Sequence, residues 1–337
     1  MIRVLSCEGS DMSKNDSVVL SVDNLSVEFS TDSGLVRVID DVSFSLKRGE
    51  ILGLVGESGS GKSVTSLAIM RLLPKRIARV SSGKVMFGGQ DLLTLADRDM
   101  QKVRGNRIGM IFQEPLTALN PVFTVGQQIV AAITSHEHVS TTEAKARAVS
   151  LLTQVGIPSP MERMQAYPFH MSGGMRQRVL IAMAIASRPD VLIADEPTTA
   201  LDVTIQAQIL DLLRKIRDET GIAVLFITHD LAVISELCDS VAVFYAGEIQ
   251  EKGRVDEVFS NPCHPYTRGL LSCIPDPQSG EPLIAIEGRP PAAMQARSGC
   301  QFAPRCIYAQ ASCSAVHPAL EIAAPGLEVR CLRWQEL

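Results

Sequence analysis

The sequence predicts an α/β protein with a parallel-sheet core, to which an antiparallel β subdomain, a helical subdomain and a small cysteine-rich C-terminal extension are attached. Continuous apolar runs at residues 51–55, 191–194 and 223–227 are typical of fully buried strands. Helical patterns separate these runs, and strands separated by helices form a parallel sheet covered on both faces. A glycine-rich loop ends the first run, which gives the order of strand, loop and helix that a phosphate-binding loop requires.

The antiparallel layer is expected ahead of the first buried run. Apolar and polar side chains alternate there from Val18 to Leu25 and again from Val36 to Leu46, as they do in half-buried strands. After the glycine loop, apolar residues recur at helical spacing as far as Leu73. These patterns place two half-buried strands of an antiparallel layer before the buried strand and one helix directly after the loop.

The helical subdomain is expected between the first and second buried runs. A helix-rich stretch begins at about Thr124, and prolines interrupt it near its end. A further helix is predicted from Val203 to Glu219, because Gly221 follows it as a typical C-terminal cap. The third buried run comes next, and another short strand is expected just before Gln113.

The chain divides into three regions in this interpretation. Residues 1–17 show no periodicity and form a flexible tail, whose true start is Met1 or Met12. The main domain occupies 18–260, with its helical subdomain at about 117–175. After Gly253 the composition shifts to proline, cysteine and glycine, so a C-terminal extension is expected at 261–337.

Composition excludes several classes of protein. The 337 residues, with 46% hydrophobic and 20% charged side chains, describe an ordinary soluble globular chain with ample length for a core. The net charge of −5 and the lack of a basic stripe argue against a nucleic-acid partner. No apolar stretch is long enough to span a bilayer, since even 179–187 is closed off by arginines. Cys7 follows too few residues for a lipoprotein signal, so a cytosolic protein is expected.

Residues 56–63, Gly-Glu-Ser-Gly-Ser-Gly-Lys-Ser, match the phosphate-loop pattern G-x-x-x-x-G-K-S. Backbone N–H groups of such a loop wrap phosphates, Lys62 can neutralise β and γ oxygens, and Ser63 can ligate Mg²⁺. A merely flexible glycine turn would explain neither the lysine nor the serine. The predicted nucleotide contacts here are Gly56, Ser58, Gly59, Ser60, Gly61, Lys62, Ser63 and Val64.

Two acidic residues follow the second buried run. Asp195 is expected at the strand end, where it can bind Mg²⁺ directly or through water. Glu196 stands beside this metal position and suits a general base that polarises the water attacking the γ-phosphate. The alternative role of the two acids is to cap the turn at Pro197, which is common for an isolated Asp-Glu pair.

A third motif, Ser172-Gly173-Gly174-Met175-Arg176-Gln177, lies between the other two. Its paired glycines let backbone N–H groups approach a phosphate closely, and a helix N-terminus follows at once. The combination of motifs resembles the ATP-binding cassette family, in which this hexapeptide is the signature motif. The resemblance implies a P-loop NTPase (RecA-like) core, with ATP and Mg²⁺ as ligands and with ATP hydrolysis as the activity.

The same resemblance implies roles for further residues. His229 would be the switch histidine of the catalytic site, Gln113 would sense Mg²⁺ and contact the membrane partner, and Phe29 would stack on adenine. Asp202 would cross the interface between two cassettes. Simpler readings exist for each of them: a hydrogen-bonding histidine and an exposed amide at strand ends, a core phenylalanine, and an N-cap for the helix at Val203.

One loop and one signature in a single chain imply a second cassette. In the family, ATP lies between the loop of one subunit and the signature of another, so Ser172, Gly173, Gly174 and Gln177 would contact the partner's ATP. Magnesium would be held through Ser63, Gln113 and Asp195. A second copy or a sister subunit is therefore required, and a sister chain forming a heterodimer is favoured. ATP would act as the dimerising ligand.

The segment at 261–271 resembles the C-terminal extension of ATPases from peptide and nickel importers. It reads Asn261-Pro262-Cys263-His264-Pro265-Tyr266-Thr267-Arg268-Gly269-Leu270-Leu271. This implies import of di- or oligopeptides, with nickel, glutathione or another small solute as alternatives. The expected partners are two transmembrane permease subunits and, indirectly, an extracytoplasmic solute-binding protein. The chain would lie peripherally on the cytoplasmic face of the bacterial inner membrane.

Four cysteines fall within the last 38 residues, in a proline-rich segment that could hardly form a core unaided. These cysteines are Cys300, Cys306, Cys313 and Cys331. Four thiolates can bind a tetrahedral Zn²⁺ ion or an iron-sulfur cluster, and their spacing alone does not distinguish the two. The family resemblance implies a [4Fe-4S] cluster, with Zn²⁺ and unligated, redox-sensing thiols as alternatives. No disulfide framework is expected without an export signal.

Two other classes of function compete with transport. Cassette ATPases that act on DNA carry long insertions between loop and signature, and ribosomal ones usually carry two cassettes, whereas this chain has an ordinary helical stretch and one cassette. A redox-sensing interaction protein with a vestigial nucleotide site is a further alternative. It is disfavoured because every catalytic side chain is present.

Overall fold

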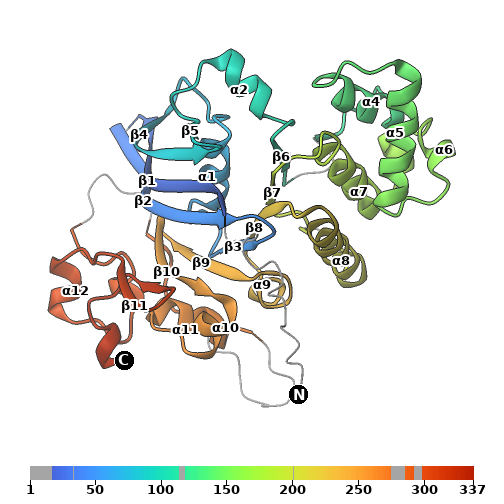
Figure 1. The fold of residues 1–337 in the computed structure, drawn as a ribbon. Helices are drawn as coiled ribbons and strands as arrows, with labels where there is room; N and C mark the ends of the chain where they lie inside the picture. Colours follow the sequence, from blue (N-terminus) through green and yellow to red (C-terminus); the bar gives the residue numbers. More distant parts are fainter. Residues whose placement is uncertain (1–16, 33, 114–117, 200, 275–284, 292–297) are drawn as a thin grey trace, which may run out of the picture.

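The computed structural model describes residues 17–32, 34–113, 118–199, 201–274, 285–291 and 298–337. Its two β-sheets lie at the centre, with one group of helices beside the larger sheet and the C-terminal extension at the opposite end (Figure 1). Met1, Cys7 and Met12 of the predicted tail lie outside the described residues, as does Thr117, where the helical subdomain was expected to begin.

The smaller sheet is antiparallel and has the strand order β2-β1-β4-β5. Its strands are β1 (Val18–Thr31), β2 (Gly34–Lys47), β4 (Ala78–Phe87) and β5 (Gln90–Asp91). The first two are the strands that the alternating pattern predicted, and they pair with each other directly, with Val22 opposite Phe44. β4 and β5 extend the predicted layer on the other side of β1.

The larger sheet has the order β11-β12-β10-β9-β3-β8-β7-β6, and it is parallel from β9 to β6. Its parallel strands are β3 (Ile51–Val55), β6 (Ile108–Ile111), β7 (Val191–Asp195), β8 (Ala223–Thr228) and β9 (Ser240–Tyr245). The antiparallel ones are β10 (Glu248–Arg254), β11 (Glu321–Ala324) and β12 (Leu327–Val329). The predicted parallel core is therefore confirmed.

Helices connect these strands. They are α1 (Lys62–Ile69), α2 (Asp97–Val103), α4 (Val125–Thr134), α5 (Thr141–Gln154), α6 (Pro160–Arg163), α7 (Gly173–Ala184), α8 (Val203–Thr220), α9 (Leu231–Leu237), α10 (Val255–Ser260), α11 (Pro265–Ser272) and α12 (Ala311–Ala315). Short 3₁₀ turns lie at η1 (Pro168–His170), η2 (Ala303–Arg305) and η3 (Trp334–Glu336). Helix α8 has nearly the predicted bounds, and Gly221 ends it in the left-handed region with φ 68°.

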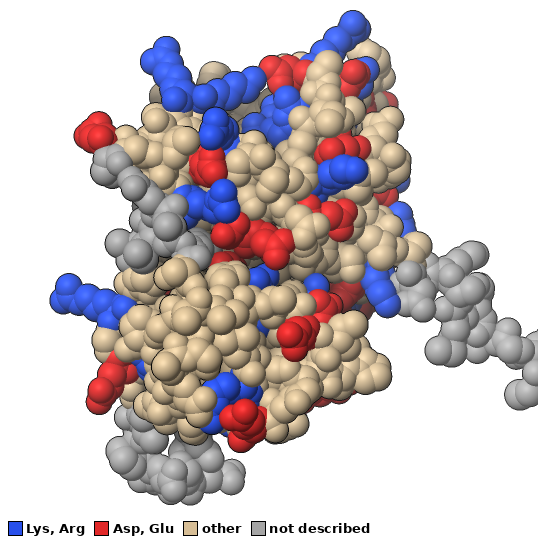
Figure 2. Space-filling model, turned by 90° about the vertical axis from the view of Figure 1, so that its left-hand side faces the viewer, with Lys and Arg blue, Asp and Glu red and all other residues tan. Residues whose placement is uncertain are grey.

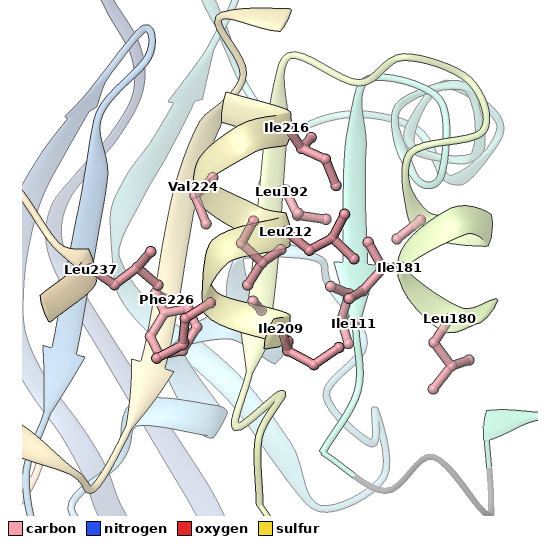
Figure 3. Close-up of a cluster of buried hydrophobic side chains, with 14 of the residues drawn as sticks. Ile111, Leu180, Ile181, Leu192, Ile209, Leu212, Ile216, Val224, Phe226 and Leu237 are labelled. Atoms are coloured by element: carbon pink, nitrogen blue, oxygen red, sulfur yellow. The ribbon is translucent and has the colours of Figure 1, made fainter. Parts of the chain in front are cut away.

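The parallel sheet separates two hydrophobic cores, because successive side chains of a strand point to opposite faces. On β7, Leu192 and Ala194 face the helices, whereas Val191 and Ile193 face the antiparallel sheet and α1. Figure 3 shows the helical side, where apolar residues of α8 such as Leu212 lie over the sheet residues Leu192 and Val224. Burial on both faces explains why these strands are continuously apolar.

The C-terminal extension is joined to the larger sheet through its last strands. β12 pairs with β10, with Val329 opposite Glu251, and β11 continues the sheet beyond it. Arg330 is 2% exposed and donates to the carbonyls of Ile249 and Pro318. The domain change expected near Ser260 therefore does not coincide with a break in the sheet, since the chain returns to it some seventy residues later.

In the described part of the chain, no helix combines the length and apolarity that crossing a bilayer demands. Figure 2 shows the face formed by the antiparallel sheet and the C-terminal extension, where Lys and Arg are interspersed with Asp and Glu. The lower part of this face, where the extension lies, carries broad uncharged areas.

Candidate nucleotide-binding site

The predicted catalytic residues meet at one edge of the parallel sheet. The loop at 56–61 follows β3, and Gln113, Glu196 and His229 follow β6, β7 and β8 respectively. Because these four strands run in the same direction, their carboxyl ends share an edge. Residues that are more than 170 positions apart in the sequence thereby reach one site.

The glycines of the loop are required by its shape. Gly56 has φ 152°, and a Cβ atom there would lie 2.1 Å from the carbonyl oxygen of Phe244. Gly59 and Gly61 adopt positive φ values of 78° and 108°, which only glycine reaches without strain. Gly61 lies directly before α1, so the loop delivers its backbone N–H groups to a helix N-terminus, the usual environment for a bound phosphate.

Lys62 is folded into the loop. Its Nζ atom donates to the carbonyl oxygens of Gly56 at 2.7 Å and Glu57 at 3.0 Å and to Ser60 Oγ at 3.3 Å. Burial lowers the pKa of Lys62, and the nearby carboxylates of Glu196 and Asp195 oppose this effect. The ammonium group of Lys62 is thus held inside the loop by neutral acceptors. Phosphate oxygens, which are charged acceptors, would bind it more strongly than these carbonyls do.

Ser63 and Asp195 face each other across the site. The hydroxyl of Ser63 donates to Asp195 Oδ1 at 2.9 Å, and the hydroxyl of Ser66 approaches Oδ2 at 3.4 Å. Burial raises the pKa of Asp195, although the hydrogen bond from Ser63 opposes the shift. A hydroxyl and a buried carboxylate in contact form an oxygen-only donor set, which fits Mg²⁺.

Glu196 is the centre of a second hydrogen-bonded group. Its Oε2 atom accepts from Gln113 Nε2 at 3.0 Å and Thr199 Oγ1 at 2.8 Å, while Oε1 lies 3.4 Å from His229 Nδ1. Burial alone would raise the pKa of Glu196, but hydrogen bonds from Thr199 and His229 outweigh it, so the pKa lies below the usual range. The side chain is therefore an ionised acceptor at neutral pH.

The backbone of Glu196 is strained, since it is a non-glycine residue with φ 47°. Its N–H donates to the carbonyl oxygen of Ile227 at 2.9 Å, which holds the peptide in place beside β8. The sequence predictions did not include Thr199 in this group. The sequence feature that could have predicted this contact is the position of Thr199, three residues after Glu196. At that spacing a short hydroxyl side chain can reach back across a turn.

Phe29 lies on β1 of the smaller sheet, and Val64 lies on α1 directly after the loop. Both are partly buried against the core that contains α1 and the antiparallel strands. Phe29 lies opposite Val36 on β2 and Ala78 on β4. Two residues further along β2, the carbonyl oxygen of Val38 lies 3.5 Å from the Cβ position of Gly61, so the same strand borders the loop.

The predicted signature residues begin helix α7. Ser172 is the N-cap, and its side chain accepts from Met175 N at 3.3 Å. A Cβ atom on Gly174 would lie 2.6 Å from Ile205 Cγ2, so close packing of α7 on α8 requires this glycine. Gln177 is fully buried, and neither of its amide atoms has a hydrogen-bond partner within the described chain. Asp202 caps α8 by accepting from Ile205 N at 2.9 Å.

The chain does not bring its own signature to its own loop. Figure 1 shows α7 with α4, α5 and α6 at one side of the molecule, away from α1 behind the antiparallel strands. The exposed N-terminus of α7 and the loop at 56–61 are consequently two separate surfaces of one chain. Each was predicted from the sequence to contact a phosphate through backbone N–H groups.

The four predicted metal-ligating cysteines lie around one small cavity. Cys300, Cys306, Cys313 and Cys331 line it together with His264 and Phe302. Burial raises the pKa of Cys300 to about 11, with Cys331 and Cys306 contributing in the same direction. As the described side chains stand, however, no three Cys, His, Asp or Glu residues form a group arranged to hold a metal ion.

These features define the class of protein: a P-loop nucleotide-hydrolysing cassette with a separate signature helix. The sequence profile of the ABC transporter family matches residues 39–199, and that of the oligopeptide/dipeptide transporter C-terminal region matches residues 250–313. The probable peptide ABC transporter ATP-binding protein y4tR of Sinorhizobium fredii is 49% identical over 322 residues, which cover 95% of this chain and 96% of that protein. The dipeptide transport ATP-binding protein DppD of Bacillus subtilis is 49% identical over 314 residues, covering 93% and 94%.

Solved structures agree with this class. The dimeric post-hydrolysis structure of the ATP-binding cassette MJ0796, bound to ADP and Pi, superposes with a TM-score of 0.63 at 27% identity and covers 70% of this chain and 99% of that one. The cbiO1 subunit of Clostridium perfringens, part of the complex cbiONQ, has the same TM-score and identity and covers 73% and 92%. The chain belongs to the ATP-binding proteins of ABC transporters, and it is an ATPase that uses ATP and Mg²⁺.

Proposed function

We propose that this chain powers the import of di- and oligopeptides through an ABC transporter. The observation that carries the proposal is the oligopeptide/dipeptide transporter C-terminal region at 250–313, joined to a complete set of nucleotide-site side chains. Relatives that share about half of their residues with this chain over almost its whole length are described as peptide and dipeptide transport ATP-binding proteins.

The chain works in this proposal as half of an ATP-driven pair of cassettes. The separation of α7 from α1 supports it, since the proposed phosphate-binding surfaces lie on different parts of one chain. The second cassette is a sister chain in a heterodimer, and two transmembrane permease subunits anchor the pair at the cytoplasmic face of the bacterial inner membrane. An extracytoplasmic solute-binding protein delivers the solute to those permease subunits.

Hydrolysis is assigned to residues of the sheet edge. Lys62 exchanges its loop carbonyls for β and γ oxygens of ATP, and Ser63, Asp195 and Gln113 supply the oxygen atoms around the metal position. Mg²⁺, when bound there, neutralises phosphate charge. Glu196 is an ionised acceptor hydrogen-bonded on two sides, which supports its role as the base that orients and deprotonates the attacking water.

His229 is assigned as the residue that stabilises this arrangement after ATP is bound. Its side chain is 58% exposed and touches Glu196 from the solvent side, so it can turn toward a phosphate without disturbing the core. Phe29 is assigned to stack on adenine. Its place beside β2, which borders the loop, supports this role.

The partner's nucleotide is contacted by the signature. Ser172, Gly173 and Gly174 present the exposed N-terminus of α7, and Gln177 supports it from within the helix. Asp202 follows directly behind this surface at the start of α8 and is assigned to the dimer interface in addition to its capping bond. Both roles are compatible, because the cap uses only one carboxylate oxygen.

We also propose that the four C-terminal cysteines hold a [4Fe-4S] cluster, with Zn²⁺ as the alternative. All four line one cavity, and three of them have pKa values raised by burial and by one another. A cation that accepts their charge would relieve this repulsion. Anaerobically purified protein should contain about four irons per chain with thiolate-to-iron absorbance that Cys306→Ser removes; colourless, iron-free protein would refute the cluster.

Purification of the native complex tests the transport function. The chain, isolated from membranes with its bound proteins, should bring down two permease subunits and a sister ATPase, and the reconstituted complex should import labelled dipeptide only with ATP. Import of nickel or glutathione in place of peptide would replace the proposed solute. Ribosomal or DNA-bound partners would overturn transport altogether.

A further inference from the structure

The phosphate loop is held from outside by the C-terminal part of the chain. Glu57, the second residue of the loop, has its backbone N–H bonded to the hydroxyl of Tyr266 on α11 at 3.1 Å. Its carboxylate accepts two hydrogen bonds from Arg305 Nη1, at 2.9 and 3.1 Å. Arg305 lies 248 positions away in the sequence, in the turn η2 just before Cys306. Neither contact is part of the phosphate-loop motif.

Arg305 is fixed on all sides. Its Nε donates to the carbonyl oxygen of Glu287 at 2.9 Å, Nη2 lies 3.3 Å from that of Ile286, and Nη1 also lies 3.3 Å from the hydroxyl of Tyr245. Its side chain is only 6% exposed, compared with 25% for Glu57. A guanidinium group held by several acceptors at once has little freedom to move, so it fixes the position of the carboxylate that it binds.

An aromatic cluster connects this contact to the cysteine segment. Tyr245 ends β9, Tyr266 lies on α11 and Phe302 lies between Cys300 and η2. Their ring centroids are 4.6 to 5.3 Å apart, and all three are almost fully buried. Packing of this kind transmits a displacement rather than absorbing it. The cluster therefore connects the cysteine segment to both residues that bind Glu57.

Glu57 is also one of the loop residues that bind Lys62. Its carbonyl oxygen accepts from Lys62 Nζ at 3.0 Å, beside the bond from the same atom to Gly56. Glu57 thus makes three contacts: its N–H donates to Tyr266, its carbonyl oxygen accepts from Lys62, and its carboxylate accepts from Arg305. Glu57 therefore helps to hold Lys62 in the loop before a phosphate is bound.

We propose that Arg305 is a positioning residue for the phosphate loop and that, through Arg305 and Tyr266, the cysteine segment at 298–337 sets the affinity of the loop for ATP. An ordered segment holds Glu57 and keeps the loop in its phosphate-binding shape; a disordered segment releases it. By linkage, bound ATP stabilises the ordered segment to the same extent. The proposal requires nucleotide binding only, so it stands or falls independently of which solute is transported.

Nucleotide titration of the full chain tests the proposal. Arg305→Met should raise the Kd for a fluorescent ATP analogue with Mg²⁺ about tenfold, in the range that couplings between sites usually span. Arg305→Lys, which keeps a cation for Glu57, should restore part of the loss. Arg254→Met is the matched control, since Arg254 pairs with Asp256 on the open surface with both side chains about two-thirds exposed, and its Kd should not change.

A double-mutant cycle with Glu57→Gln identifies the route. If Arg305 acts through the Glu57 carboxylate, Arg305→Met should weaken binding much less in the Glu57→Gln background than in the natural chain. An equal loss in both backgrounds, or a loss that appears only with a lowered melting temperature of the nucleotide-free protein, overturns the positioning role. An unchanged Kd in Arg305→Met overturns the whole proposal.

Discussion

The amide of Gln113 donates a hydrogen bond to Glu196 Oε2 over 3.0 Å, which joins the ends of β6 and β7 across the nucleotide site. Gln113 lies directly before the connection to the helical subdomain, and Glu196 lies directly after the predicted metal ligand Asp195. Any displacement of Gln113 would therefore change the hydrogen bonding of the proposed catalytic base. The contact thus joins the end of the described segment that contains β6 to the proposed catalytic base.

Replacement of Glu196 by Gln should stop hydrolysis and leave ATP binding intact. The amide keeps the shape and the contacts to Thr199 but cannot accept a proton, so the rate should fall roughly 10²- to 10⁴-fold. Steady-state ATPase measurements and size-exclusion chromatography with ATP check this, because the variant should accumulate as a closed pair. Glu219→Gln, at an exposed helix end, should behave as the natural chain. Normal turnover in Glu196→Gln would remove the base from this position.

Replacement of Asp195 by Asn should abolish Mg²⁺-dependent hydrolysis and yet stabilise the nucleotide-free protein by about 1 kcal/mol at neutral pH. Burial raises the pKa of Asp195, so folding favours its protonated form, and its ionisation opposes folding as pH rises through that pKa. The advantage of the amide should accordingly shrink as pH falls below it. Denaturant unfolding of both chains across pH provides the measurement, and a constant difference at all pH values would contradict this account.

Replacement of Gly174 by Ala should destabilise the chain by about 1 to 2 kcal/mol, since the new methyl group would lie 2.6 Å from Ile205 Cγ2. Gly173→Ala is the comparison within the same motif, because its nearest atom is at an ordinary 3.6 Å and its stability should change little. In an Ile205→Ala background the penalty at Gly174 should largely disappear. Equal effects of the two glycine substitutions on thermal unfolding would argue against helix packing as the cause.

Replacement of Phe29 by Leu should weaken ATP binding roughly tenfold and leave the melting temperature of the nucleotide-free protein nearly unchanged, since leucine keeps apolar volume but loses the ring face. Phe29→Tyr, which retains the ring, should bind ATP as the natural chain does. Calorimetric titration of the three proteins with ATP distinguishes the cases. If Phe29→Leu binds ATP normally, Phe29 is a packing residue of the antiparallel sheet only.

The sheet and the edge that carries the site could be predicted because both follow from local signals. Continuous apolar runs identified buried parallel strands, and strands of one direction place the residues that follow them at one edge. The parallel direction of the strands, which the sequence already implied, therefore places Gln113, Glu196 and His229 at one site. Gly221 likewise ended α8 where a left-handed residue was needed.

Other relationships left no local signal. β12 has only three residues, too few for a periodic pattern, and its pairing with β10 depends on the fold of everything between them. The contact between Arg305 and Glu57 joins two residues that look like ordinary surface charges in the sequence. Charge pairs between distant segments are set by packing, and the burial of Arg305 becomes evident only when the aromatic cluster is assembled around it.

The pairing of β12 with β10 has a practical consequence for anyone who trims this chain. Removal of the residues after 260 would leave one side of β10 without its partner strand. The backbone groups of Gln250 and Lys252 would then form an exposed, unpaired edge of the larger sheet. Unpaired strand edges form hydrogen bonds with strands of other chains and so promote aggregation. An isolated cassette made in this way should aggregate for reasons unrelated to ATP, because β12 covers this edge of β10 in the full chain.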